Sequence, residues 1–112
     1  MREQDKALTI AIAEFMGLSV EWDDLFKQYQ YKAPIKIDGS TTIDIMLEYS
    51  PVTGNGTQLN EFVEKVGMSI SYNSLDEDWN AEIDKLNYFK SDKSRTKATL
   101  FCAAEFLGVE WS

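Results

Sequence analysis

Acidic side chains are the residues of this chain with the greatest capacity for chemistry. The sequence of 112 residues holds 19 Asp and Glu against 11 Lys and Arg, and it has no histidine. The absence of an imidazole excludes histidine-based nucleophile triads, imidazole general bases and the commonest transition-metal ligand. Oxygen-ligand chemistry remains, because carboxylates in a flexible loop are the groups that bind calcium or magnesium.

Two groups of neighbouring carboxylates are candidates for such a site. One is Asp76–Asp78 in an expected turn, and the other is made of Glu21, Asp23 and Asp24. Neither group has the regular spacing, central glycine and distal glutamate of an EF-hand calcium loop. Paired carboxylates for hydrolysis must face each other across a cleft, which no spacing here indicates. We interpret Asp76–Asp78 as a solvated acidic turn, and a carboxylate–metal enzyme is the least favoured of three functional hypotheses.

Cys102 and a glycine-rich loop are two further candidates. Cys102 lies beside Phe101 and Ala103 on an expected helix, where a buried and unreactive thiol is the usual state. As the only cysteine it cannot form an internal disulfide, so nothing requires an oxidising compartment. The loop 54–57 (GNGT) precedes a helix, but the lysine of a phosphate-binding loop is absent. We therefore expect no catalytic residue, no metal ligand and no cofactor.

The stretch Lys85–Lys97 is the exception to the acidic balance. It contains five basic residues and one acid, Asp92, with Tyr88 and Phe89 among them. The five are Lys85, Lys90, Lys93, Arg95 and Lys97. Such a basic and aromatic stretch can contact single-stranded nucleic acid or an acidic partner. The formal net charge of −8 repels nucleic acid at long range. A solvated strand end and linker is therefore the favoured interpretation, and nucleic-acid association is the alternative.

Three amphipathic helices, each ending at a glycine, are expected to position these groups. The first begins within residues 2–5 and ends before Gly17, the second ends before Gly67, and the third ends before Gly108. The segments 6–17 (KALTIAIAEFMG) and 97–108 (KATLFCAAEFLG) are alike. We attribute this likeness to convergence, because the residues around the two segments do not repeat in sequence.

The strands are expected from alternation of apolar and polar residues. Residues 35–49 alternate around Asp38-Gly39 and predict a hairpin, and 68–72 predicts a strand with one buried face. Another half-buried strand is expected from Trp79, with a change of phase near Lys85 that indicates a bulge or a covered second face. Residues 19–32 have no clear period and are expected to form a loop or short helical turn.

The composition supports one folded domain over residues 1–112. Hydrophobic residues make up 44% of the chain and aromatic residues 12%, which is enough for a core. We expect an α+β fold with about four mostly antiparallel strands and three helices packed on the sheet. Helices on both faces would give an α/β/α sandwich.

The order of these segments resembles the phage ABA sandwich domain family, small proteins of bacteriophages and prophage-bearing bacteria. The resemblance lies in IAEFMG, in LNEFVEKVG after a loop, in the serine-tyrosine strand, in the W-N-A strand start and in AAEFLG. The family often has a tryptophan before the central helix, where Thr57 or Gln58 stands here. The resemblance implies a sheet sandwiched between helices. It implies no biochemical activity, so no catalytic residue follows from it.

The leading hypothesis is a small non-enzymatic phage or prophage accessory protein that acts by binding another protein of the phage or its host. No signal peptide or membrane-spanning segment is expected, so the host bacterial cytoplasm is the expected location. The residues that bind the partner and the oligomeric state are left open.

Overall fold

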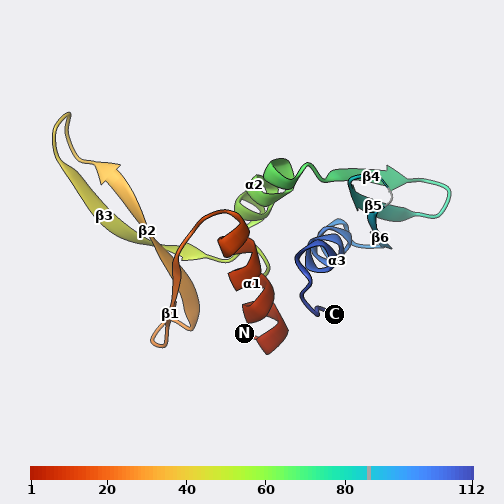
Figure 1. The fold of residues 1–112 in the computed structure, drawn as a ribbon, viewed down its shortest axis with the longest axis horizontal. Coiled ribbons are helices and arrows are strands. Elements are labelled where there is room, and N and C mark those ends of the chain that lie inside the picture. The colour runs from red at the N-terminus through yellow and green to blue at the C-terminus, as the bar shows by residue number, and fades with distance from the viewer. Residues whose placement is uncertain (86) are drawn as a thin grey trace.

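The computed structural model describes residues 1–85 and 87–112 and shows an α+β fold with three helices and two antiparallel three-stranded sheets (Figure 1). The elements in chain order are α1 (Glu3–Phe15), β1 (Val20–Asp23), β2 (Gln28–Lys36), β3 (Thr42–Tyr49), α2 (Gly56–Val66), β4 (Ser69–Asn73), β5 (Asp78–Ile83), β6 (Tyr88–Asp92) and α3 (Arg95–Leu107). The first sheet has the order β1-β2-β3 and the second β4-β5-β6. The α+β class and the three helices are therefore confirmed.

The expectation of about four strands in one sheet, sandwiched by helices, is wrong. The helices lie in the middle of the molecule, with one sheet toward each end (Figure 1). The sequence pattern does not predict two of the strands, β1 and β6. Residues 19–32 form β1 and the first half of β2, and the basic stretch contains β6. The phase change near Lys85 is a turn, in which Asp84 and Lys85 have φ of 54° and 38°. Leu86, on which that expectation also rested, lies outside the described residues.

The chain repeats one structural unit, a helix followed by a three-stranded antiparallel sheet. Counterparts in the two units lie fifty positions apart, as Gly17 and Gly67 do. In the first hairpin Val20 pairs with Tyr31, and in the second Ile70 pairs with Ala81. This repeat relates α1 to α2, whereas the similar segments 6–17 and 97–108 lie at α1 and α3, so it does not account for their likeness. The two units share backbone geometry and hydrogen bonds. Different residues can form these, so the repeat does not require an identical sequence.

All three helices end in the same way. Gly17, Gly67 and Gly108 have φ of 75°, 77° and 72°, a left-handed conformation that glycine adopts without strain. The amide of the next residue donates to the carbonyl five positions earlier, at 2.8, 3.0 and 2.9 Å. This pattern satisfies helix-terminal carbonyls and fixes the direction in which the chain leaves the helix. The prediction that each helix ends at a glycine is confirmed.

The turn after the first strand of each sheet also repeats. The carboxylate of Asp23 accepts from the amides two and three positions later, at 2.8 and 3.3 Å. The side chain of Asn73 accepts from the corresponding amides at 3.0 and 3.4 Å. Lys27 and Glu77, at equivalent positions of the two turns, both have φ of 54°. These side-chain bonds take the place of a glycine turn signal, which is why alternation alone did not reveal the first hairpin.

The core lies where the three helices meet each other and both sheets, with Tyr29 and Tyr49 contributed by the first sheet. The ring of Phe15 packs edge-on against Phe62 at 5.3 Å and Phe106 at 5.6 Å, so one aromatic cluster joins all three helices. Helix α3 lies across β5 and β6 and buries Ala81 and Ile83 beneath it. This packing confirms that the last helix covers a sheet.

The C-terminal segment is tied back to α1. The indole N–H of Trp111 donates to a carboxylate oxygen of Asp5 at 2.8 Å, and Arg2 binds the same carboxylate through a hydrogen bond and ion pair of 3.0 Å. The amide of Ser112 donates to the side-chain oxygen of Gln4 at 3.0 Å. These bonds hold the two ends of the described chain side by side.

The β2–β3 hairpin extends well beyond the rest of the molecule. We call residues 31–47, from the Tyr31–Leu47 pair to the turn, the arm. In the second sheet the equivalent hairpin turns directly after the pair Ile83–Tyr88, whereas the arm continues to the pair Lys36–Thr42. The molecule therefore measures 54 × 32 × 21 Å, and the arm projects away from the helices (Figure 1). Its radius of gyration of 15.8 Å exceeds the value of about 13 Å usual for a compact domain of this length.

Candidate interaction surface

The acidic turn Asp76–Asp78 is held by hydrogen bonds and an ion pair with its neighbours. Lys93 forms an ion pair with Asp78 at 3.1 Å and donates to the backbone oxygen of Asp76 at 3.0 Å. The side-chain Nδ2 of Asn73 donates to the Asp76 carboxylate at 3.0 Å. No group of three or more potential metal-ligating side chains occurs in residues 1–85 and 87–112. These carboxylates act within the turn and its connection to the start of α3.

The second acidic group is likewise dispersed. Asp23 shapes the β1–β2 turn, and Asp24 accepts a hydrogen bond from the indole N–H of Trp22 at 2.9 Å. Glu21 lies within β1, in the wall of a shallow hollow. The three carboxylates therefore do not converge on one point.

Cys102 is fully buried on α3, which confirms its expected role in packing. Its thiol donates a weak hydrogen bond to the backbone oxygen of Tyr88 at 3.5 Å. Burial, with a smaller contribution from the charge of Glu105, raises the pKa of this thiol to about 11. The nucleophilic thiolate is therefore rare at neutral pH.

Much of the positive charge in the stretch Lys85–Lys97 is matched by neighbouring acids. Lys90 forms an ion pair with Glu105 of α3 at 2.8 Å, and Lys93 pairs with the acidic turn. The guanidinium of Arg95 lies over the ring of Trp79 at 5.7 Å. The expectation of a strand end and linker is corrected here, because residues 88–92 form a full strand that pairs with β5. Lys90, Lys93 and Arg95 therefore connect β6 and the start of α3 to neighbouring elements.

The loop before α2 is a helix cap, as expected. Asn55 accepts from the amide of Gln58 at 2.9 Å through its side-chain oxygen. The buried side chain of Gln58 then accepts from the amide of Ser50 at 2.7 Å and donates to the backbone oxygen of Glu48 at 2.8 Å. Gln58 therefore closes the loop and also hydrogen-bonds to the backbone at the end of β3.

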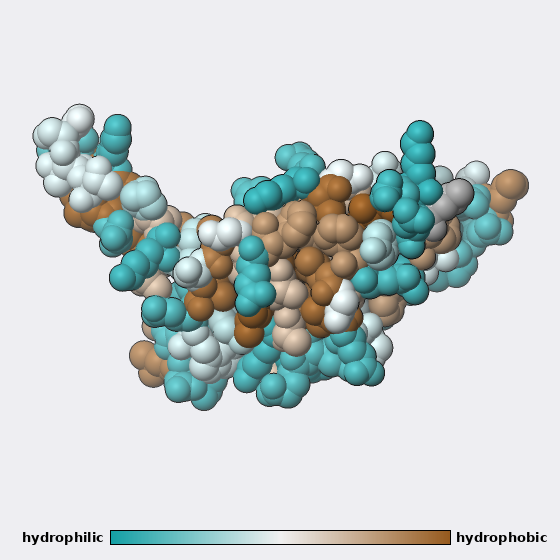
Figure 2. Space-filling model, viewed as in Figure 1, coloured by the Kyte–Doolittle hydropathy of each residue, from teal (hydrophilic) through white to brown (hydrophobic). Residues whose placement is uncertain are grey.

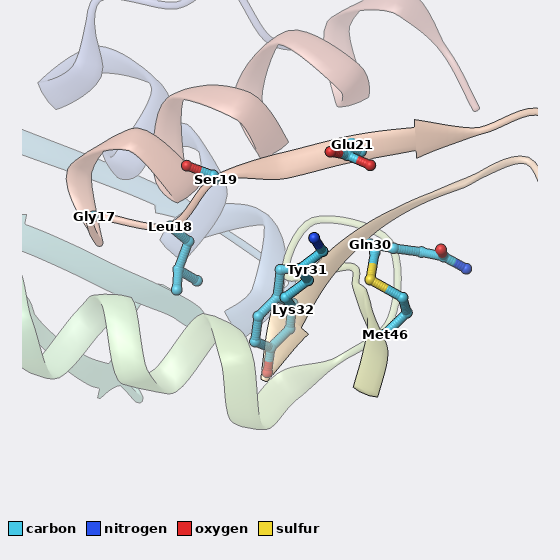
Figure 3. Close-up of a pocket in the computed structure, with 8 residues that line it drawn as sticks. All are labelled: Gly17, Leu18, Ser19, Glu21, Gln30, Tyr31, Lys32 and Met46. Atoms are coloured by element: carbon cyan, nitrogen blue, oxygen red, sulfur yellow. The ribbon is translucent and has the colours of Figure 1, made fainter. Parts of the chain in front are cut away.

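A hollow of about 360 Å³ lies between the end of α1 and the first sheet. The residues around it are Gly17, Leu18, Ser19, Glu21, Gln30, Tyr31, Lys32 and Met46 (Figure 3). Leu18 and Tyr31 point to the same side of the strands in this view. The lining side chains of the hollow include one carboxylate, one ammonium group, one amide and the hydroxyl groups of Ser19 and Tyr31. It brings together none of the catalytic or metal candidates considered from the sequence except Glu21.

The arm carries an apolar face, which the alternation of the sequence predicts to be buried. Ile35 pairs with Ile43 and Ala33 with Ile45, so these side chains share one face, while Lys32 lies on the other. The hairpin itself, around Asp38-Gly39, is as predicted. However, Ile35 and Ile43 are 40% and 42% exposed. The alternation correctly predicted the shared face but could not show that this part of the hairpin extends beyond the helices.

In the second sheet a helix covers the face that corresponds to the apolar face of the arm. Ala81 and Ile83, on the corresponding face of β5, are 0% and 4% exposed because α3 covers them. In the described part of the chain no helix covers the outer arm in this way (Figure 1). Hydrophobic residues lie exposed along one side of the arm (Figure 2). Figure 2 also shows hydrophobic residues gathered over the helices in the middle of this view. The arm therefore carries an uncovered apolar surface on a projecting element.

Comparisons with protein families, with curated proteins and with solved structures find no match to this chain. Among the residues that the structure describes, no helix has the length and apolar character needed to cross a membrane.

Proposed function

We propose that this protein is a non-enzymatic binding module that recognises another protein through the arm. The single observation that carries the proposal is the apolar face of the arm, with Ile35, Ile37 and Ile43 between 40% and 62% exposed. Apolar side chains that are contiguous and uncovered on a projecting element are characteristic of interaction sites. The phage or prophage role and the host cytoplasm are proposed from the sequence resemblance.

The other two hypotheses have weaker support. Association with nucleic acid would use Lys85–Lys97, but Lys90 and Lys93 are engaged by carboxylates and the net charge is −8. A carboxylate–metal enzyme would use Asp76–Asp78, whose Asp78 is paired with Lys93. Neither site presents an uncovered surface comparable to the arm. Protein binding is therefore the function that the geometry supports best.

Capture of partners by wild-type and variant protein tests the proposal. The tagged chain is incubated with lysate of lysogenic or infected bacteria, beside the arm variant Ile35→Asp/Ile43→Asp. The matched control is Leu75→Asp, which places the same group at a 93% exposed leucine of the other sheet. Circular dichroism establishes that all three proteins are folded.

We expect the wild type and Leu75→Asp to retain the same protein, and the arm variant to lose it at least tenfold. Equal capture by all three proteins, or no specific capture by the wild type, would contradict binding through the arm.

A further inference from the structure

We propose that the arm binds a second copy of this chain, with β3 of the two copies paired antiparallel about a two-fold axis at Ile45. The inference rests on the proposed function of the arm as a docking surface and names the occupant of the β3 edge, with the apolar faces of the two arms side by side in the shared sheet. The first sheet would then become one six-stranded sheet that runs through the dimer.

The outer edge of β3 is open to a further strand. Strand β3 has eight residues and is the edge strand of its sheet. The amide of Ile37 donates to the carbonyl of Thr41. Because every second residue of an antiparallel pair bonds to the partner strand, the N–H and C=O groups of Ile43 and Ile45 point toward β2. Those of Asp44 and Met46 therefore point outward. Gln58 occupies the outer edge at Glu48, but the strand before it stays open.

The opposite edge of the same hairpin is protected. Strand β1 covers β2 as far as the pair Val20–Tyr31. Beyond that pair, β2 carries Lys32, Pro34 and Lys36 at its outward-facing positions. Proline lacks an amide donor, and lysine is common on edges that resist pairing. The two edges of the hairpin thus differ. The β2 edge has outward-facing lysines and a proline, and the β3 edge has neither.

The sequence of β3 is complementary to itself when the axis passes through Ile45. Asp44 then lies opposite the partner's Met46. Thr42 lies opposite the partner's Glu48, where the backbone oxygen already accepts from Gln58 and the new pairing ends. On the apolar face, Ile43 lies opposite the partner's Leu47, and the two copies of Ile45 face each other. No carboxylate stands opposite another in this register, whereas an axis through Asp44 would place two aspartates together.

Charges on the polar face support the same register. Lys32 pairs with Met46 within the hairpin, and Lys36 pairs with Thr42. In the dimer each lysine lies two strand spacings, about 10 Å, from a carboxylate of the second copy. Lys32 faces the partner's Asp44, and Lys36 faces the partner's Glu48. The arm therefore offers attraction between copies although the whole chain carries a net charge of −8.

Molecular mass and site-specific cross-linking test this arrangement. We expect the 12.8 kDa chain to sediment as a dimer at micromolar concentration. Met46→Pro removes an outward amide and should weaken dimerisation at least tenfold while leaving the β2–β3 ladder intact. Lys36→Pro makes the same change on the other edge of the hairpin and should leave the dimer unchanged. Ile45→Lys, which places like charges at the axis, replaces Met46→Pro if that variant does not fold.

The cross-link reports the register. In a Cys102→Ala background, Ile45→Cys should form an intermolecular disulfide, because residues at the axis have Cα atoms about 4.5 Å apart. Ile37→Cys is more exposed, but it lies far from the axis and should not cross-link. A wild type that stays monomeric at hundreds of micromolar overturns the second copy as occupant. In that case, capture lost only from the arm variant would still uphold binding of another protein. A dimer that is insensitive to Met46→Pro and Ile45→Lys and fails to cross-link at Ile45→Cys also overturns the inference.

Discussion

At the scale of single residues, the side chains with reactive chemistry serve the structure. Cys102 is enclosed by the core, Asp23 and Asp24 shape a turn, and Lys93 binds the acidic turn. The sequence could predict the buried state of Cys102 from its apolar neighbours on a helix. It could not predict the ion pairs of Lys90 and Lys93, because their partners lie on other elements.

Cys102 should react slowly with thiol reagents while the protein is folded. Burial raises the pKa of the thiol to about 11 and also blocks access. At pH 8 we expect modification by an aromatic disulfide reagent to be at least a hundredfold slower than in denaturant. Spectrophotometry of the released thiol measures both rates. Comparable rates in the two states would contradict burial of Cys102.

Asp5 should make stability depend on acid. The hydrogen bond from Arg2, assisted by that from Trp111, holds the pKa of Asp5 below its ordinary value. The stabilisation is therefore present above the ordinary carboxylate pKa of about 4, and it is lost as pH falls through the lowered value. Asp5→Asn should cost about 1–3 kcal/mol at pH 7 by urea unfolding, and less at pH 2. An equal loss at both pH values would contradict the role of the charge.

At the scale of elements, the helix, its glycine and the hairpin after it form the repeated unit. The sequence predicted the helices and their glycine ends, because both depend on local pattern. It missed the first hairpin, in which Asp23 forms the turn and Lys27 adopts a left-handed conformation without glycine. It also missed the division into two sheets, which depends on where the helices pack.

Gly67 should matter for stability through backbone conformation alone. A Cβ atom at this position would meet nothing within 4 Å, but φ is 77°. Gly67→Ala should therefore cost about 1 kcal/mol in the free energy of unfolding. Gly54→Ala is the matched control, because its Cβ would also meet nothing and its φ is not in the left-handed region. Equal denaturation midpoints for the two variants would contradict the conformational explanation.

Phe106 should contribute to the docking of α3. Its ring packs edge-on against Phe15 at 5.6 Å and Tyr88 at 5.4 Å, so it joins α3 to α1 and β6. Phe106→Ala should cost roughly 3 kcal/mol, measured by chemical denaturation. An unchanged midpoint would show that α3 does not depend on this cluster.

At the scale of the whole molecule, the structure is a thin body with a projecting arm. The alternation of apolar residues in 35–49 predicted the hairpin and its apolar face. It could not distinguish a face covered by a helix from one that is uncovered, because both have the same pattern of side chains. The difference arises from the extra length of β2 and β3 relative to β5 and β6. That extra length carries the proposed site.

Amide hydrogen exchange along β3 tests most directly whether its outer edge receives another strand. In the isolated chain the amides of Ile43 and Ile45 bond to β2, whereas those of Asp44 and Met46 point outward. At high dilution Asp44 and Met46 should exchange rapidly. As the protein concentration rises, their exchange should slow at least tenfold, while that of Ile43 and Ile45 changes far less. Rapid exchange of Asp44 and Met46 at every concentration would contradict pairing of β3 with a second copy.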